Sequence, residues 1–422
     1  MKTKTPIGML LLLSLAPVAR AEIVAVENAT IWVSSTEKLE DATLIVRDGV
    51  VLAAGRGVAV PGGQAAVKID GRGLVVTAGL VETGARIGVD EIGAEAPTVE
   101  GQLPSVPGNA VHAAYRIDWG YNPTSVAVDV ARAGGITQAV VIPDGGLVAG
   151  RSAWIALPEG AVTPPVVRAE LAVHVTLGER GLAPGLGSRG LALLELRELL
   201  DDAAQYAKRR QAFEENRARR FAASRLDLEA LIPVVQGRTP LVIDVRRASD
   251  IAQVIALAAE LKLKVILLGA TEAWRLAPEL ARAKIPVVYC PEHNLPSSFD
   301  ELWVRDDAAT ILDKAGVELI LAPLAGSMSS RTLRQIAGIA VANGLPWPAA
   351  LAAITSTPAK VFGLAPRGTL RAGQPADFVV WSGDPFELST RPLHIYIGGV
   401  KQKLTNHQTE LLQRYRHLGG SR

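Results

Sequence analysis

The sequence predicts an α/β protein whose larger part is a TIM-type (β/α)8 barrel. From residue 79 to about residue 365, short apolar segments alternate with helical stretches, which is the pattern of parallel βα units. Units in this number close most readily as a barrel. The structural alternative is a doubly wound open sheet, but no Gly-rich phosphate-binding loop follows the first predicted strand.

The predicted barrel strands are short apolar segments separated by polar or helical stretches. They cover residues 135–142, 171–177, 241–244, 264–268, 286–289 and 318–322. Residues 249–261 and 271–283 carry apolar side chains at helical spacing and predict helices. The highly charged residues 190–225 predict a solvated helix with ion pairs along its face, or alternatively a lid helix or a partner surface.

The residues before the barrel predict a small all-β unit. Residues 23–26, 29–33, 42–46 and 50–54 have strand composition, and Asp48-Gly49 predicts a hairpin turn before the last of them. Residues 395–401 predict another hairpin strand near the C-terminus. Residues 22–78 are too few to form a whole domain, so this unit requires further strands from elsewhere in the chain.

Composition excludes several classes of partner and site. The 422 residues are 49% hydrophobic and 20% charged, with a formal net charge of +2, which gives no sign of a nucleic-acid partner or an acidic membrane surface. Cys290 is the single cysteine, so the chain forms no internal disulfide and no thiolate metal cluster.

The N-terminus predicts a secretory signal peptide over residues 1–21. Lys2 and Lys4 form a basic segment, residues 7–18 are apolar, and Ala19-Arg20-Ala21 is typical of a cleavage site. The apolar segment is too short for a membrane span, and no later stretch predicts one. We therefore expect cleavage after Ala21 and a periplasmic or secreted protein.

Three segments carry a resemblance to a known family. Residues 78–82 resemble the approach to a Pro-Gly-Leu-Ile-Asp-x-His-x-His motif, and residues 368–380 resemble the closing motif Gly-Ser-Leu-x-x-Gly-x-x-Ala-Asp-Leu-Val-Val. Residues 240–251 resemble Pro-Val-x-x-His-Ala-His-Arg-Ala-x-Asp-Ile. Through these motifs the chain resembles the amidohydrolase superfamily, and within it the exported imidazolonepropionase-like proteins, over almost the whole mature chain.

The resemblance implies a domain organisation and an activity. It implies a composite β-sandwich domain built from residues 22–78 and 366–404, with the barrel of residues 79–365 inserted between them and a tail at 405–422. It also implies hydrolysis of C–N bonds other than peptide bonds, often in cyclic amides, with one or two divalent metals.

The positions of the family's metal ligands and of its general base hold other residues here. The resemblance places Gly84 and Arg86 at the first strand, Asp244 and Arg246 at the fifth, Gly269 at the sixth, and Leu324 at the base on the eighth. Glycine and leucine have no donor atom, and arginine keeps its proton. We therefore expect no metal and no cofactor at the usual site.

The remaining polar residues suggest a pocket and a few catalytic candidates. Glu82, Arg86, Asp244 and Arg246 are the predicted pocket residues, and we expect Arg86 to form an ion pair with Asp244 in place of the metal. The candidates for residual catalysis are Asp244, His174 and His293. For the two histidines the alternatives are a core residue at His174 and a loop residue bonded to backbone at His293.

Two classes of function follow from these expectations. The first is an amidohydrolase-like protein without metal-dependent activity, which binds a small anionic ligand or serves as partner of an active relative. The alternative is an active hydrolase on cyclic amides or related C–N bonds with a displaced or metal-free site, and a divalent metal such as Zn²⁺ is expected only under this alternative. A homo- or hetero-oligomer is compatible with either class.

Overall fold

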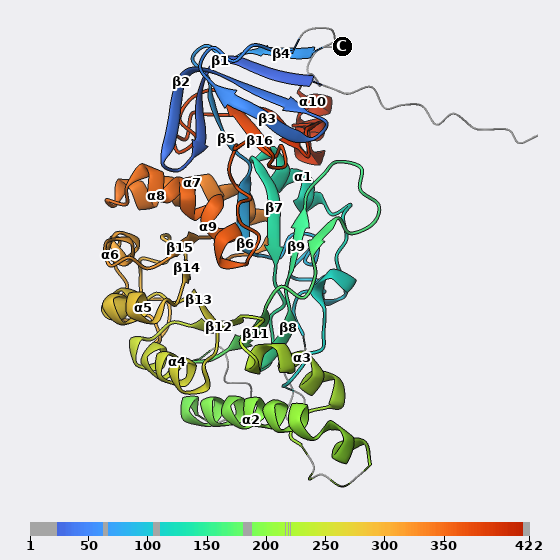
Figure 1. Cartoon of the computed structure of the whole chain (residues 1–422), viewed down its shortest axis with the longest axis vertical. Coiled ribbons are helices and arrows are strands. Elements are labelled where there is room, and N and C mark those ends of the chain that lie inside the picture. The colour runs from blue at the N-terminus through green and yellow to red at the C-terminus, as the bar shows by residue number, and fades with distance from the viewer. Residues whose placement is uncertain are drawn as a thin grey trace, which may run out of the picture.

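A computed structural model describes residues 23–61, 66–103, 110–179, 188–215, 217, 219 and 221–416. The predicted signal peptide, residues 1–21, lies outside the described residues. The N-terminal and C-terminal parts of the chain meet in one β-sheet, shown with both blue and red strands at the top of Figure 1. Its strands run in the order β18-β17-β16-β5-β1-β2-β3, and β4 also pairs with β1.

The bounds of these strands show which end of the chain supplies each. The strands are β1 (Ile23–Ser34), β2 (Glu37–Arg47), β3 (Val50–Gly55), β4 (Ala66–Asp70), β5 (Val75–Ala78), β16 (Phe378–Trp381), β17 (Pro392–Ile397) and β18 (Val400–Gln402). The two ends join where β5 pairs antiparallel with β16. Two of the hairpin turns are formed by Asp48-Gly49 and Gly398-Gly399, all with positive φ, as a tight two-residue turn requires.

This sheet differs from the two separate sheets of the predicted sandwich, because hydrogen bonds join all its strands. The long strand β1 is responsible. It pairs with β2 along one edge, and along the other with β4 at residues 23–27 and with β5 at residues 30–31. Register shifts between Val26 and Ser34 bend β1, and a bent strand can serve successive partners.

The rest of the chain forms a mostly parallel arc of strands with helices around it. One sheet has the order β10-β9-β7-β6 and another the order β15-β14-β13-β12-β11-β8. Their strands are β6 (Leu80–Ala85), β7 (Ile136–Val141), β8 (Val148–Arg151), β9 (Ala153–Ala156), β10 (Val166–Arg168), β11 (Val173–Thr176), β12 (Leu241–Val245), β13 (Val265–Gly269), β14 (Val287–Tyr289) and β15 (Leu319–Leu321).

The arc departs from the predicted closed barrel in two ways. The strands β8 and β9 run antiparallel to their neighbours: β8 pairs with β11, and β9 pairs with β7. Only Ser152 separates β8 from β9 in the chain. In addition, no strand pairing joins β15 to β6 among the described residues. The Val81 amide on β6 donates to the Ile354 carbonyl at 2.8 Å, and Pro323 follows the short β15 without an N–H to donate.

Helices cover the outside of the arc, and the last helix, α10, lies beside the β-domain (Figure 1). They are α1 (Val126–Ala133), α2 (Arg189–Glu214), α3 (Arg225–Val235), α4 (Ala248–Leu261), α5 (Ala277–Ala283), α6 (Ala308–Lys314), α7 (Leu333–Ala342), α8 (Trp347–Ala353), α9 (Ser356–Val361) and α10 (His407–Tyr415). Short 3-10 turns lie at η1 (Ala96–Thr98), η2 (Ile117–Trp119), η3 (Ala273–Leu276) and η4 (Ser327–Thr332). None of the helices in the described ranges has the length and apolar character that a membrane span requires.

Side chains also line the inside of the arc and form a core there. Valine, isoleucine and leucine from successive strands pack together, among them Val140, Val242, Ile266, Val288 and Ile320. Because the carboxyl ends of these strands lie at one end of this core, polar residues that follow the strands are brought together.

Candidate functional site

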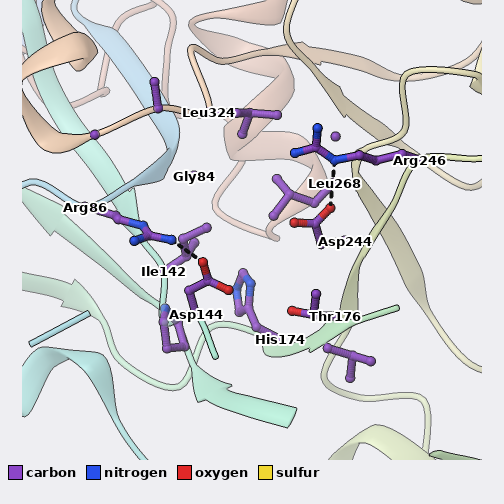
Figure 2. A pocket seen from close by; sticks show the side chains of 15 residues that line it. Gly84, Arg86, Ile142, Asp144, His174, Thr176, Asp244, Arg246, Leu268 and Leu324 are labelled. Atoms are coloured by element: carbon purple, nitrogen blue, oxygen red, sulfur yellow. Dashed lines mark hydrogen bonds and ion pairs between the residues drawn. The ribbon is translucent and has the colours of Figure 1, made fainter. Parts of the chain in front are cut away.

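A cavity of about 270 Å³ lies at the carboxyl ends of the strands, and we call it the mouth cavity. It is lined by Gly84, Arg86, Ile142, Pro143, Asp144, His174, Val175, Thr176, Asp244, Arg246, Leu268, Gly269, Leu324, Ala325 and Gly326. All six residues at the expected positions of the metal ligands and the general base therefore line one cavity, together with His174. Figure 2 shows two pairs of charged side chains facing each other across it.

Arg86 and Asp144 form the first charged pair. Arg86 follows β6, and its guanidinium donates to the carboxylate of Asp144 and to Asp90 Oδ2 at 3.3 Å. The Gly145 amide donates to Asp144 Oδ1 at 2.8 Å, which fixes this carboxylate beside the guanidinium. Two carboxylates therefore compensate one cation on this side of the cavity.

Asp244 and Arg246 form the second pair, on the opposite side in Figure 2. Asp244 lies on β12 and Arg246 follows it, with Arg246 Nε 3.8 Å from Asp244 Oδ1. The Arg246 guanidinium also donates to Glu301, whose side chain is only 1% exposed. Burial alone would raise the pKa of Glu301, but the Ser297 hydroxyl and the positive charge of Arg246 together lower it.

His174 lies between the two pairs, on β11. Its side chain is buried, and its Nε2 has no hydrogen-bond partner among the described residues. Burial lowers the pKa of His174 to about 3, although the nearby negative charge of Asp144 acts in the opposite direction. The imidazole is therefore neutral at ordinary pH and presents an unsatisfied nitrogen in the wall of the cavity.

The residues present do not fit a divalent metal at the mouth cavity. A Cβ added to Gly84, which has φ +85°, would lie 2.7 Å from Leu324 Cδ2, so Leu324 fills the space of a ligand side chain at this position. Two guanidinium groups stand where neutral or anionic donors would be needed. In the described part of the chain, no group of three His, Cys, Asp or Glu side chains has the spacing of a metal site.

The structure corrects three site predictions. The expected ion pair between Arg86 and Asp244 is wrong, because each of them pairs with a different residue. Glu82 does not line the mouth cavity, and its burial, with no cationic partner among the described residues, raises its pKa to about 8. His293 is half-buried in the loop after β14 and also lies outside the lining.

Sequence reasoning missed Asp144, Thr176 and Glu301. Asp144 comes three residues after β7 and Thr176 ends β11, so a search of the carboxyl ends of all predicted strands would have found both. Glu301 lies twelve residues after β14, in a loop without a motif, and only the fold brings it to Arg246.

The comparisons with known proteins agree with one another. The sequence model of the amidohydrolase family matches residues 322–400. Amidohydrolase tasK of Hapsidospora irregularis is 43% identical over 60 residues, which cover 14% of this chain and 6% of that protein. The C-terminal part of the chain therefore resembles the amidohydrolase family. The chain spans only a small part of this relative's length, so the resemblance assigns no substrate.

Solved structures extend the likeness to most of the chain. An amidohydrolase from Thermotoga maritima MSB8 has a TM-score of 0.79 and 24% identity, over 90% of this chain and 99% of that one. A prolidase complexed with N-methylphosphonate-L-proline has a TM-score of 0.55 and 14% identity, over 90% and 99%. Molinate hydrolase has a TM-score of 0.53 and 16% identity, over 91% and 95%. At these identities the likeness shows the amidohydrolase fold alone.

Proposed function

We propose that this amidohydrolase-family protein binds a small zwitterionic ligand in the mouth cavity and does not perform metal-dependent hydrolysis. The observation that carries the proposal is the replacement of the usual metal site by Gly84, Leu324 and two guanidinium groups, each held by carboxylates. The carboxylate that would act as general base in the family has an apolar leucine in its place. Binding is therefore better supported than hydrolysis.

The charges of the lining favour a zwitterion over the simple anion expected from the sequence. The lining contains two guanidiniums and two carboxylates, with His174 neutral between them. A ligand with one negative and one positive group can bind a guanidinium and a carboxylate at once, whereas an anion would compete with Asp144 and Asp244. An amide N–H or carbonyl between these groups would satisfy His174 Nε2.

The experiment compares three probes of nearly the same size. Ala-Ala is a zwitterion, N-acetyl-Ala-Ala carries only a negative charge, and Ala-Ala amide carries only a positive charge. We expect Ala-Ala to bind about tenfold more tightly than either relative in titration calorimetry, since each loses one charged hydrogen bond. Equal affinities for all three would contradict the zwitterion proposal, and metal-dependent cleavage of Ala-Ala would contradict the loss of hydrolysis.

The second candidate is metal-free hydrolysis by Asp244, His174 or His293, and it has less support. An imidazole whose pKa is about 3 is a weak general base near neutral pH. The Asp244 carboxylate lies 3.8 Å from the Arg246 guanidinium and is engaged in this ion pair. His293 lies outside the cavity lining.

We also infer a closed barrel, a composite β-domain and export of the protein. The Leu324 side chain, which follows β15, occupies the space that a Cβ on Gly84 of β6 would need, and this supports a family barrel closed here by side chains. The shared sheet of β5 and β16 supports a composite β-domain. Residues 1–21 support export, with the mature protein starting at Glu22.

A further inference from the structure

A second and larger cavity lies at the amino ends of the same strands, and we call it the base cavity. Its volume is about 610 Å³. Most of the residues that line it precede or begin the strands β11 to β15, and the others lie at the end of α9 or, as Arg168, at the end of β10. It is therefore at the opposite end of the arc from the mouth cavity and shares no residue with it.

The lining of the base cavity is strongly positive. It contains five cations, namely Arg168, Arg238, Lys264, Lys284 and Lys360, and a single carboxylate, Glu318. Lys360 forms an ion pair with Glu318. The other four cations have no carboxylate within ion-pair distance among the described residues, so the lining has a formal charge of +4 at neutral pH.

Only some of these cations donate hydrogen bonds to neighbouring residues. Arg168 Nη1 donates to the carbonyls of Phe362 and Gly363 at 3.4 and 3.3 Å, which places the guanidinium at the edge of the cavity. Arg238 donates to the side chain of Gln236, its near neighbour. Lys264 and Lys284 are exposed, and their ammonium groups are free to meet a ligand.

Helix ends do not account for all of these cations. Cations near a helix C-terminus interact favourably with the helix dipole, and this accounts for Lys262 at the end of α4 and for Arg282 and Lys284 at the end of α5. Lys264 lies beyond the cap of α4, next to β13, and lines the cavity with Lys284. Like charges in one cavity repel, so their grouping is unfavourable unless an anion binds there.

The floor of the cavity is apolar. It includes Leu171, Val265, Ile266, Ile285 and Phe362, each 6% exposed or less. A ligand that fits both the charged rim and this floor has anionic groups on one side and a hydrocarbon or aromatic part on the other.

We propose that the base cavity binds a small organic dianion with an apolar part, such as a phosphate monoester or a dicarboxylate. Lysine ammonium groups act as point charges for phosphate and carboxylate oxygens, and two of them are placed in adjacent loops of the same lining. The ligand contacts Lys264 and Lys284 with its charges and lies against Phe362 and Ile285 with its apolar part. This site is independent of the ligand proposed for the mouth cavity.

The test uses three aromatic probes at pH 8 and constant ionic strength. Phenyl phosphate and phthalate are dianions, and benzoate is a monoanion with the same ring. We expect both dianions to bind at least tenfold more tightly than benzoate in titration calorimetry, and the tighter dianion identifies phosphate or dicarboxylate as the preferred group. Affinities for benzoate equal to those for the dianions, or no binding of either dianion, would overturn the proposal.

A matched pair of double variants places the binding in the base cavity. Lys264→Gln with Lys284→Gln removes two lining charges, and Lys262→Gln with Arg282→Gln removes two charges from the same loops outside the lining. Lys262 and Lys284 both cap a helix in the left-handed conformation, so each double variant changes one such cap. We expect the first to lose about tenfold in affinity for the preferred dianion and the second to lose less than threefold. Equal losses would overturn the assignment.

Discussion

The two cavities at opposite ends of the strand arc differ in how their charges are compensated. In the mouth cavity, Arg86 and Arg246 are largely buried, and each contacts a carboxylate. In the base cavity, Lys264 and Lys284 are exposed and have no carboxylate partner among the described residues. Removing one partner of a mouth-cavity pair leaves a buried charge uncompensated, whereas the base-cavity lysines can lose their charge without that cost.

The largest expected effect is at the mouth. Glu301→Ala leaves the Arg246 guanidinium without its buried partner, and we expect a loss of about 3 kcal/mol in the free energy of unfolding. Urea denaturation followed by circular dichroism measures this loss. The double variant Arg246→Met with Glu301→Ala should recover at least half of it, because no buried charge is left alone. A Glu301→Ala variant as stable as the parent would contradict the structural role of this pair.

Glu82 is a buried carboxyl with no cationic partner in the described part of the chain, and it differs in this from the paired carboxylates of the mouth cavity. Burial raises the pKa of Glu82 from 4.5 to about 8, so the folded protein holds this proton more tightly than the unfolded chain. The stabilising contribution of Glu82 to the free energy of unfolding is fully present below pH 4.5. It is lost as pH rises to 8, at about 1.4 kcal/mol per pH unit.

Glu82→Gln removes this dependence. The variant and the parent should be alike near pH 4.5, and the variant should be more stable at pH 8, by an amount that grows with pH between these limits. Unfolding in urea at pH 5, 6.5 and 8 measures the difference. Parallel stability curves for the two proteins would show that Glu82 ionises normally.

His174 gives the opposite pH dependence. Burial lowers its pKa to about 3, so the unfolded chain takes up a proton first as pH falls below 6.5. Its stabilising contribution is present above pH 6.5 and is lost as pH falls toward 3. We expect His174→Asn to be less sensitive to acid than the parent in the same urea experiments between pH 6.5 and 4. A variant that loses stability with acid as steeply as the parent would argue against a buried neutral imidazole.

The smallest expected effect is at the base. Removing the charges of Lys264 and Lys284 together should change the free energy of unfolding by less than about 0.5 kcal/mol, because both side chains are exposed and neither forms an ion pair with another described residue. Thermal unfolding of the double glutamine variant tests this. A clear loss of stability would mean that these lysines are structural, as Arg246 is.

The sequence was sufficient to predict those strands and turns that depend on a local apolar pattern or on local turn residues. The predicted strands at 241–244, 264–268 and 286–289 occur as β12, β13 and β14, and the Asp48-Gly49 turn lies between β2 and β3. The family motifs placed Gly84, Asp244, Gly269 and Leu324 in one cavity, because those motifs mark the carboxyl ends of strands.

The ion pairs and strand pairings that depend on the fold could not be predicted in the same way. Arg86 was expected to reach Asp244, but Asp144 and Asp90 lie closer once β7 and the loop after β6 are in place. The antiparallel β8 and the missing pairing of β15 with β6 also depend on contacts that no local pattern carries. The base cavity went unnoticed because its cations are scattered singly through separate loops.

The central claim is that ion pairs and apolar side chains have replaced the metal at the mouth cavity. The most direct test is elemental mass spectrometry of the purified protein after incubation with Zn²⁺, Mn²⁺ and Fe²⁺ and removal of free metal. We predict no stoichiometric metal that depends on the mouth cavity, with the parent and Asp244→Ala giving the same low content. About one metal per chain, lost in Asp244→Ala, would contradict the claim and restore metal-dependent hydrolysis as the function.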